Sequence, residues 1–235
     1  MVNKLNIVKL KEAFLSAKPY PHVVIDNFLE DTVAQKILNE FPSADNDIWG
    51  WKSNDENSIK QMCQDADRIK TLPNIWSSIE FLNSSSFLEQ VSKFTNMPTL
   101  YGDNEFSGGG LHLIKRGGHL KLHVDFNIAE SLPDLNRRLN IILFMNPNWK
   151  SEWGGGLELW NTDCTKCVVT VEPLFNRAVI FDTQPKDEIL PWHGHPSPLQ
   201  CPEDVHRKSI ALYYYSKEKP ETKMSKKHKT IYRSN

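Results

Sequence analysis

The chain has 235 residues, of which 39% are hydrophobic and 24% charged, and its formal net charge is −1. These values are typical of one large globular domain and give no reason to expect a nucleic-acid or membrane partner. No apolar run approaches the roughly 20 residues of a membrane helix, and the N-terminus lacks the apolar stretch of a secretory signal, so we expect a cytoplasmic protein.

The first part of the chain has mixed character. The β-branched run Tyr20–Ile25 predicts a short strand. Val33, Ile37 and Phe41 recur at helical spacing, which predicts a helix over Thr32–Phe41, capped by Asp31 and ended by Pro42.

Two longer segments follow. The polar stretch Asp45–Asp67 predicts a loop, and apolar stripes within Leu72–Phe94 predict one or two helices. We therefore expect residues 1–100 to form a helical and mixed support region.

From Tyr101 onward, short β-rich runs alternate with turn clusters that include three groups of glycines. This pattern is typical of an all-β sandwich or barrel and not of βαβ units. The predicted strands are Leu111–Ile114, Leu120–Phe126, Leu139–Met145, Leu157–Trp160, Cys167–Val171, Ala178–Phe181 and Ser209–Tyr215. We expect a core over residues 101–216 and a basic tail over 217–235, which is either frayed or a peripheral helix.

The triplet His123-Val124-Asp125 lies in one predicted strand. Side chains two residues apart share a face of a strand, so the imidazole and the carboxylate converge, while Leu122, Val124 and Phe126 point the other way. Two histidines and one carboxylate on one side of an iron ion leave three coordination positions open. Taken alone, the triplet is either part of an iron site that needs one more histidine or a surface strand with two polar residues.

Two candidates for that histidine, His193 and His195, follow the buried-looking strand Ala178–Phe181. They have the same strand parity, so spacing alone leaves the choice open.

Arg207, Ser209 and Ala211 share one face of the last predicted strand, and Ile210, Leu212 and Tyr214 share the other. An arginine among small residues suits a cavity wall, where its guanidinium can grip a carboxylate with two hydrogen bonds. The apolar face is expected to pack on helices.

Other polar residues have simpler explanations. Arg137-Arg138 is expected to be a solvated basic pair, although it could attract an acidic substrate. Cys164-Thr-Lys-Cys167 has the spacing of half a zinc site, but no second pair matches it, so two ordinary thiols are expected. The lysines of the tail could bind substrate, but a solvated segment is the simpler reading.

The stretch Leu111–Lys217 resembles the prolyl 4-hydroxylase-like branch of the 2-oxoglutarate/Fe(II)-dependent dioxygenases, of bacterial and viral type. The resemblance covers nearly half the chain and follows a fixed order of motifs. These motifs are His123-Val124-Asp125, Phe144–Trp149, Gly154–Leu159, Val171–Arg177, His193 and the strand beginning at Arg207.

This resemblance implies a mainly β, α+β protein with a double-stranded β-helix (jelly-roll) core buttressed by N-terminal helices. It implies Fe(II) on His123, Asp125 and His193, and Arg207 at the far carboxylate of 2-oxoglutarate. Several relatives place a tyrosine near that carboxylate where this chain has Phe144, so Asn140, of the same parity, is a candidate substitute, or else a buried amide bonded to backbone.

The implied reaction is hydroxylation of a proline residue in a peptide or protein by O2, with release of succinate and CO2, and with ascorbate as a possible reductant. Two alternatives stay open. The first is hydroxylation of another amino acid side chain or of a small molecule on the same scaffold, and the second is a non-catalytic, cupin-like binding module.

Overall fold

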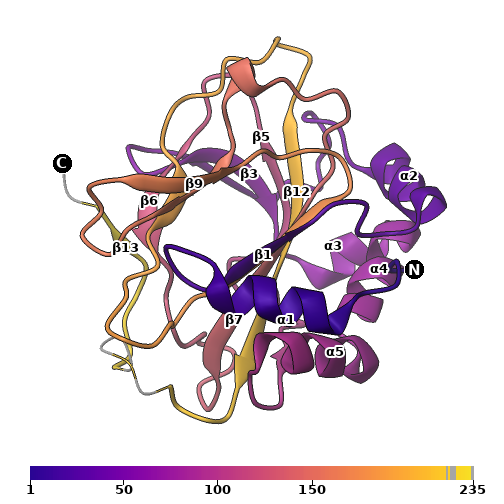
Figure 1. Cartoon of the computed structure of the whole chain (residues 1–235). Coiled ribbons are helices and arrows are strands. Elements are labelled where there is room, and N and C mark those ends of the chain that lie inside the picture. The colour runs from indigo at the N-terminus through magenta and orange to yellow at the C-terminus, as the bar shows by residue number, and fades with distance from the viewer. Residues whose placement is uncertain (221, 223–225, 234–235) are drawn as a thin grey trace.

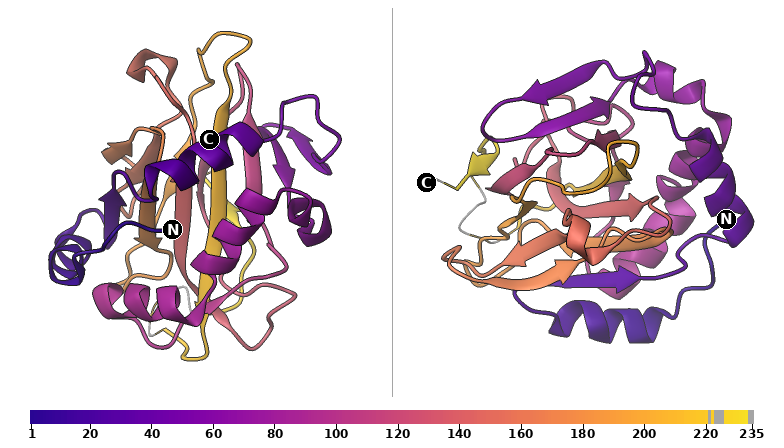
Figure 2. Two further views of the ribbon diagram at one scale, coloured as in Figure 1. Left: turned by 90° about the vertical axis from the view of Figure 1, so that its right-hand side faces the viewer. Right: turned by 90° about the horizontal axis from the view of Figure 1, so that it is seen from above.

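The computed structural model describes all residues except 221, 223–225 and 234–235. Two antiparallel sheets face each other, and helices cover the outer side of the larger sheet (Figures 1 and 2). None of the helices in the described part of the chain has the length and hydropathy that a membrane span requires.

The larger sheet has the strand order β1-β10-β7-β12-β5-β3-β2, and β4 pairs with β12 beside this path. Its strands are β1 (His22–Ile25), β2 (Trp51–Asn54), β3 (Ile59–Cys63), β4 (Tyr101–Gly102), β5 (Gly110–Ile114), β7 (Asn136–Phe144), β10 (Arg177–Asp182) and β12 (Arg207–Ser216).

The smaller sheet has the order β13-β6-β11-β8-β9. Its strands are β6 (Leu120–Val124), β8 (Leu157–Trp160), β9 (Cys167–Val171), β11 (His193–His195) and β13 (Ile231–Tyr232). A 3-10 turn, η1 (Ser151–Trp153), precedes β8. Two facing antiparallel sheets of this kind confirm the predicted jelly-roll core buttressed by helices.

The helices form a layer over β12 and its neighbours (Figure 2). They are α1 (Ile7–Ser16), α2 (Asp31–Glu40), α3 (Ala66–Lys70), α4 (Pro73–Leu82) and α5 (Ser85–Thr95). The main hydrophobic core lies between this layer and the larger sheet. It contains Ile210, Leu212 and Tyr214, so the apolar face predicted for the last strand does pack on helices.

Three predictions about local structure were wrong. The segment Asp45–Asp67 is not a loop, because it holds the hairpin β2–β3, which extends the larger sheet at β5. Asp31 does not cap its helix but is the first helical residue, where its charge favours the helix dipole. Phe126 does not point away from the site, because β6 ends at Val124 and strand parity ends with it; Phe126 lines the site cavity.

The tail prediction was also wrong for its described residues. Residues 226–233 are neither frayed nor helical, because β13 pairs with β6, with Ile231 opposite Val124 and Tyr232 opposite His123. The rest of the predicted tail includes residues 221, 223–225 and 234–235, which lie outside the described residues.

Candidate metal centre and its cavity

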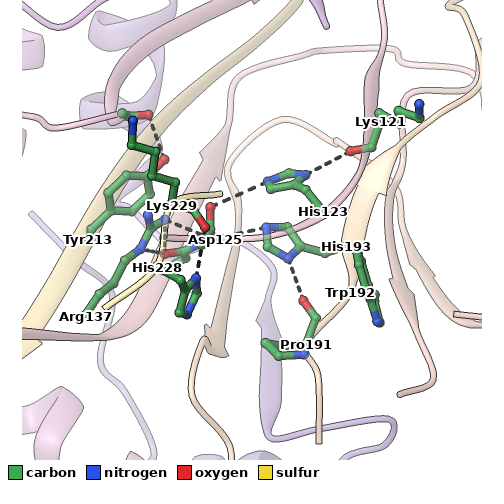
Figure 3. Close-up of polar contacts among 12 residues, drawn as sticks. Lys121, His123, Asp125, Arg137, Pro191, Trp192, His193, Tyr213, His228 and Lys229 are labelled. Carbon is green, nitrogen blue, oxygen red and sulfur yellow. Dashed lines mark hydrogen bonds and ion pairs between the residues drawn. The ribbon is translucent and has the colours of Figure 1, made fainter. Parts of the chain in front are cut away.

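His123, Asp125 and His193 form a buried group on the inner side of the smaller sheet (Figure 3). His123 on β6 lies directly opposite His193 on β11, and their ring centroids are 4.3 Å apart. Asp125 follows β6, and its carboxylate oxygens lie 3.5 Å from His123 Nε2 and 3.3 Å from His193 Nε2. One potential ligand atom from each residue falls within 4.8 Å of the others, so these three atoms could hold one metal ion.

The hydrogen bonds of both histidines suit metal binding. His123 Nδ1 lies 2.9 Å from the carbonyl oxygen of Lys121, and His193 Nδ1 lies 2.9 Å from that of Pro191. A carbonyl only accepts, so each Nδ1 carries the hydrogen and each Nε2 keeps a lone pair that faces Asp125. Burial lowers the pKa of His123, which favours the neutral, ligating form. The donor set therefore fits a divalent iron ion.

Arg137 and Asn140 hold the carboxylate of Asp125 from the other side. Arg137 Nη2 lies 3.0 Å from Asp125 Oδ2, and Asn140 Nδ2 donates to the same oxygen at 2.8 Å. Arg137 also donates to Asn140 Oδ1 from Nε at 2.9 Å and from Nη2 at 2.7 Å, so the three side chains form one network. Burial alone would raise the pKa of Asp125, but Arg137 and the two histidines hold it well below its ordinary value.

The Arg137 side chain is fully buried. Its guanidinium carbon lies 3.4 Å from the ring centroid of Tyr213 and 4.6 Å from that of Phe126. The expectation of a solvated basic pair is therefore wrong for Arg137, which forms a buried cation–π and ion-pair contact instead. Arg138 is partly buried and donates to Ser216 Oγ.

The metal group lines a cavity of about 210 Å³ between the two sheets. Arg207, Ser209 and Ala211 line the opposite wall from β12, as the strand pattern predicted. Arg207 is 4% exposed and donates from Nε to the carbonyl of Gly155 at 2.7 Å. Gly155 has φ +74°, and a Cβ there would meet Leu199 at 2.5 Å and Arg207 at 3.1 Å, so the close approach requires glycine.

The cavity is cationic on the side of Arg207. Lys60 from β3 also lines it, and burial lowers the pKa of Lys60 to about 8. Within the described residues neither Arg207 nor Lys60 has a carboxylate within ion-pair distance. Arg207 is buried and Lys60 is partly buried, and unpaired cations in such positions are costly, which favours an anionic ligand in this cavity.

His195 and Asn140 differ from the other site residues. His195 lines the cavity but lies outside the metal group, and neither of its ring nitrogens has a hydrogen-bond partner in the described structure. The amide of Asn140 is occupied by Asp125 and Arg137, so its role toward a co-substrate stays a prediction.

The sequence analysis did not identify Arg137, Lys60 or Tyr232 as parts of the site. Tyr232 lines the cavity, and its ring lies 5.7 Å from that of His123. The only sequence signal for these residues was their charge or aromatic character, which many surface residues share.

Comparisons with known proteins agree with this geometry. Residues 109–215 match the model of the 2OG-Fe(II) oxygenase superfamily. Prolyl 3,4-dihydroxylase OGFOD1 of Ostreococcus tauri is 25% identical over 186 residues, which are 73% of this chain and 34% of that protein. The chain thus spans about a third of the length of this curated relative.

Solved structures with a similar fold include a prolyl 4-hydroxylase from Phytophthora capsici, with a TM-score of 0.57, 19% identity, and coverage of 91% of this chain and 68% of that chain. A prolyl hydroxylase from Trichoplax adhaerens, solved with a hypoxia inducible factor peptide fragment, has a TM-score of 0.54 and 16% identity, and the match covers 91% of this chain and 94% of that chain. A prolyl-4-hydroxylase from Pseudomonas putida has a TM-score of 0.53 and 12% identity, with coverage of 89% and 97%. Residues 109–215, slightly less than half of the chain, thus match the 2OG-Fe(II) oxygenase superfamily, and the chain shares its fold with these solved structures.

Proposed function

We propose that this protein hydroxylates a proline residue in a polypeptide, with iron(II), 2-oxoglutarate and O2, and that it releases succinate and CO2. The family supports the co-substrates. The relatives named as prolyl hydroxylases support proline as the target, and one of them was solved with a peptide fragment.

One observation carries the proposal: the buried group His123–Asp125–His193 shares a single cavity with the unpaired cations Arg207 and Lys60. 2-Oxoglutarate is a dianion, so it needs positive charge at both of its ends. A metal ion on the three ligands supplies charge at one end, and the two side chains supply it at the other.

His123, Asp125 and His193 would hold the iron, which, when bound, supplies the redox chemistry that couples decarboxylation of 2-oxoglutarate to hydroxylation. The backbone carbonyls of Lys121 and Pro191 fix the orientation of the two imidazoles.

Arg137 and Asn140 hold Oδ2 of Asp125, so that its Oδ1 faces His123. Arg207 grips the far carboxylate of the co-substrate. Apolar neighbours in the cavity wall, Ile142, Leu157 and Ala211, exclude water from the reacting groups.

The test is to incubate the iron-loaded protein with 2-oxoglutarate and proline-containing peptides under oxygen. We expect succinate, and a peptide mass gain of one oxygen atom on proline. Asp125→Ala should abolish both, and Asp134→Asn, at an exposed position, is the matched control. Absence of turnover in the wild type would refute the oxygenase function, and oxidation only of non-proline residues would refute the proline target.

Two further parts of the proposal concern the setting of the reaction. Ascorbate would keep the iron reduced, and succinate yield over many turnovers with and without ascorbate tests this. A cytoplasmic location suits the four cysteines, which are all free thiols, because such thiols persist in a reducing compartment. Fractionation of cells that express the tagged chain tests the location.

A further inference from the structure

A groove of about 650 Å³, which we call the tail groove, lies beside the metal cavity. One side is formed by residues 227–230 of the C-terminal tail, and the other by residues 128–130, which follow β6. Gly108, Phe126 and Thr230 line both the tail groove and the metal cavity, so the two spaces adjoin. A ligand in the tail groove therefore lies next to the place where the reaction occurs.

The tail is fixed against the protein on both sides of the groove. The buried side chain of Asn127 donates to the carbonyl of Lys226 at 2.8 Å and accepts from the backbone N–H of His228 at 3.0 Å. Beyond the groove, β13 pairs with β6, and Arg233 N donates to the carbonyl of Leu122 at 2.9 Å. The tail is thus a wall of the site with a defined position.

The tail groove has an apolar floor and a basic rim. Phe126, Ile128 and Ala129 supply apolar surface. Lys227 and Lys229 lie exposed on the tail side, and neither forms an ion pair with any described residue. Among the described residues that line the groove, Glu130, on the facing side, is the single carboxylate. An apolar floor suits the body of an extended polypeptide, and the lysines suit acidic side chains beside it.

We propose that the tail groove binds the polypeptide segment next to the reacting residue, and that Lys227 and Lys229 select segments that carry aspartate or glutamate. This inference rests on the proposed function, because it takes the substrate to be a polypeptide. It adds the chemical class of the flanking sequence. The volume of the groove falls in the range of ligand sites, roughly 300–1,000 Å³, and accommodates a short segment and not a folded domain.

Three fluorescein-labelled peptides of equal length, each with one central proline, test the inference. Their flanking residues are acidic, neutral or basic. Binding to the full chain, loaded with iron(II) and 2-oxoglutarate without oxygen, is measured by fluorescence anisotropy at low and at high salt. We expect the acidic peptide to bind about tenfold tighter than the neutral one at low salt, and the difference to shrink at high salt because the charges are exposed.

The variant Lys227→Glu/Lys229→Glu should lose this preference and favour the basic peptide. Lys9→Glu/Lys36→Glu, which makes the same change of charge on the exposed face of the helical layer, is the matched control and should keep it. The control separates a local contact from an effect of net charge.

Three results would overturn the inference: no binding of the acidic peptide by the wild type, equal binding of all three peptides, or the same preference in both double variants. Tighter binding by the Lys227→Glu/Lys229→Glu variant would also overturn it, since the tail would then block the groove. Binding of 2-oxoglutarate by the wild type is measured separately through its shift of the Tm. If 2-oxoglutarate does not shift the Tm of the wild type, the proposed function is contradicted. If it does shift the Tm but the acidic peptide is not preferred, only the inference about the tail groove is contradicted.

Discussion

Arg137 Nη2 and Asp125 Oδ2 lie 3.0 Å apart in a buried ion pair at the candidate metal centre. The pair ties a potential metal ligand, which lies just after β6 of the smaller sheet, to β7 of the larger one. Asn140 bridges the two side chains, so the position of the carboxylate depends on both sheets.

Arg137→Met should therefore weaken both the fold and the metal site. Removing one partner of a buried ion pair costs about 3–5 kcal/mol, and loss of a residue that orients a metal ligand costs roughly 10–100-fold in metal affinity. Urea unfolding of the metal-free protein and titration with Co(II) measure the two effects. Arg177→Gln breaks the more exposed pair with Asp26, and we expect a loss of under about 1 kcal/mol and unchanged Co(II) affinity. Equal effects of the two variants would contradict the role of Arg137.

His193→Ala and His195→Ala should differ in metal binding. His193 belongs to the metal group, whereas His195 lies outside it. We expect His193→Ala to lose high-affinity Co(II) binding and its absorption bands, and His195→Ala to retain them. Retention in the first variant and loss in the second would reverse the ligand assignment.

Lys60 should make 2-oxoglutarate binding depend on pH. Its pKa of about 8 means that the ammonium is charged below pH 8 and neutral above it, so the affinity for the dianion falls as the pH rises from 7 to 9. Lys60→Arg should flatten this dependence, because an arginine stays charged, and Lys60→Met should weaken binding at pH 7. Calorimetric titration of the Mn(II)-loaded protein with 2-oxoglutarate measures the dissociation constant. A wild-type affinity that is constant between pH 7 and 9 would rule out this contribution.

Local patterns were sufficient to predict most of the β core. The seven predicted strands from Leu111 to Tyr215 all exist, with ends shifted by a few residues, because alternation of side chains is information that each strand carries itself. The hairpin β2–β3 was missed because its sequence is polar. Its formation depends on pairing of β3 with β5, where Gln61 lies opposite Leu113, and that contact is distant in sequence.

The candidate site, like the fold, could be predicted only where local patterns carry the information. Strand parity predicted that His123 and Asp125 face the same site, and they do, although Asp125 lies just beyond the end of β6. It did not reveal Arg137, because the pairing of β12 with β7 shifts register between Tyr214 and Tyr215. Leu139, Ile141 and Leu143 pack under the helices, yet Arg137, of the same parity, contacts Asp125 in the site. A similar register shift lies between His193 and His195, two residues that strand parity alone could not rank.

Asp182→Asn should stabilise the protein at neutral and alkaline pH. Asp182 is buried on β10, and burial raises its pKa from 3.8 to about 6. Between these values the folded state keeps a proton that the unfolded state has released, so the free energy of unfolding falls as the pH rises and stays low above pH 6. This shift of the pKa lowers the free energy of unfolding by up to about 3 kcal/mol. Asparagine has no charge to bury, and its Oδ1 can still accept from Gln184 N, as Asp182 does at 2.8 Å.

Urea unfolding at pH 5 and pH 8 measures the effect. Asp182→Asn should raise the free energy of unfolding more at pH 8 than at pH 5. Asp134→Asn, at an exposed position, should change the free energy of unfolding by the same small amount at both pH values. A gain that is larger at pH 5 would contradict the raised pKa.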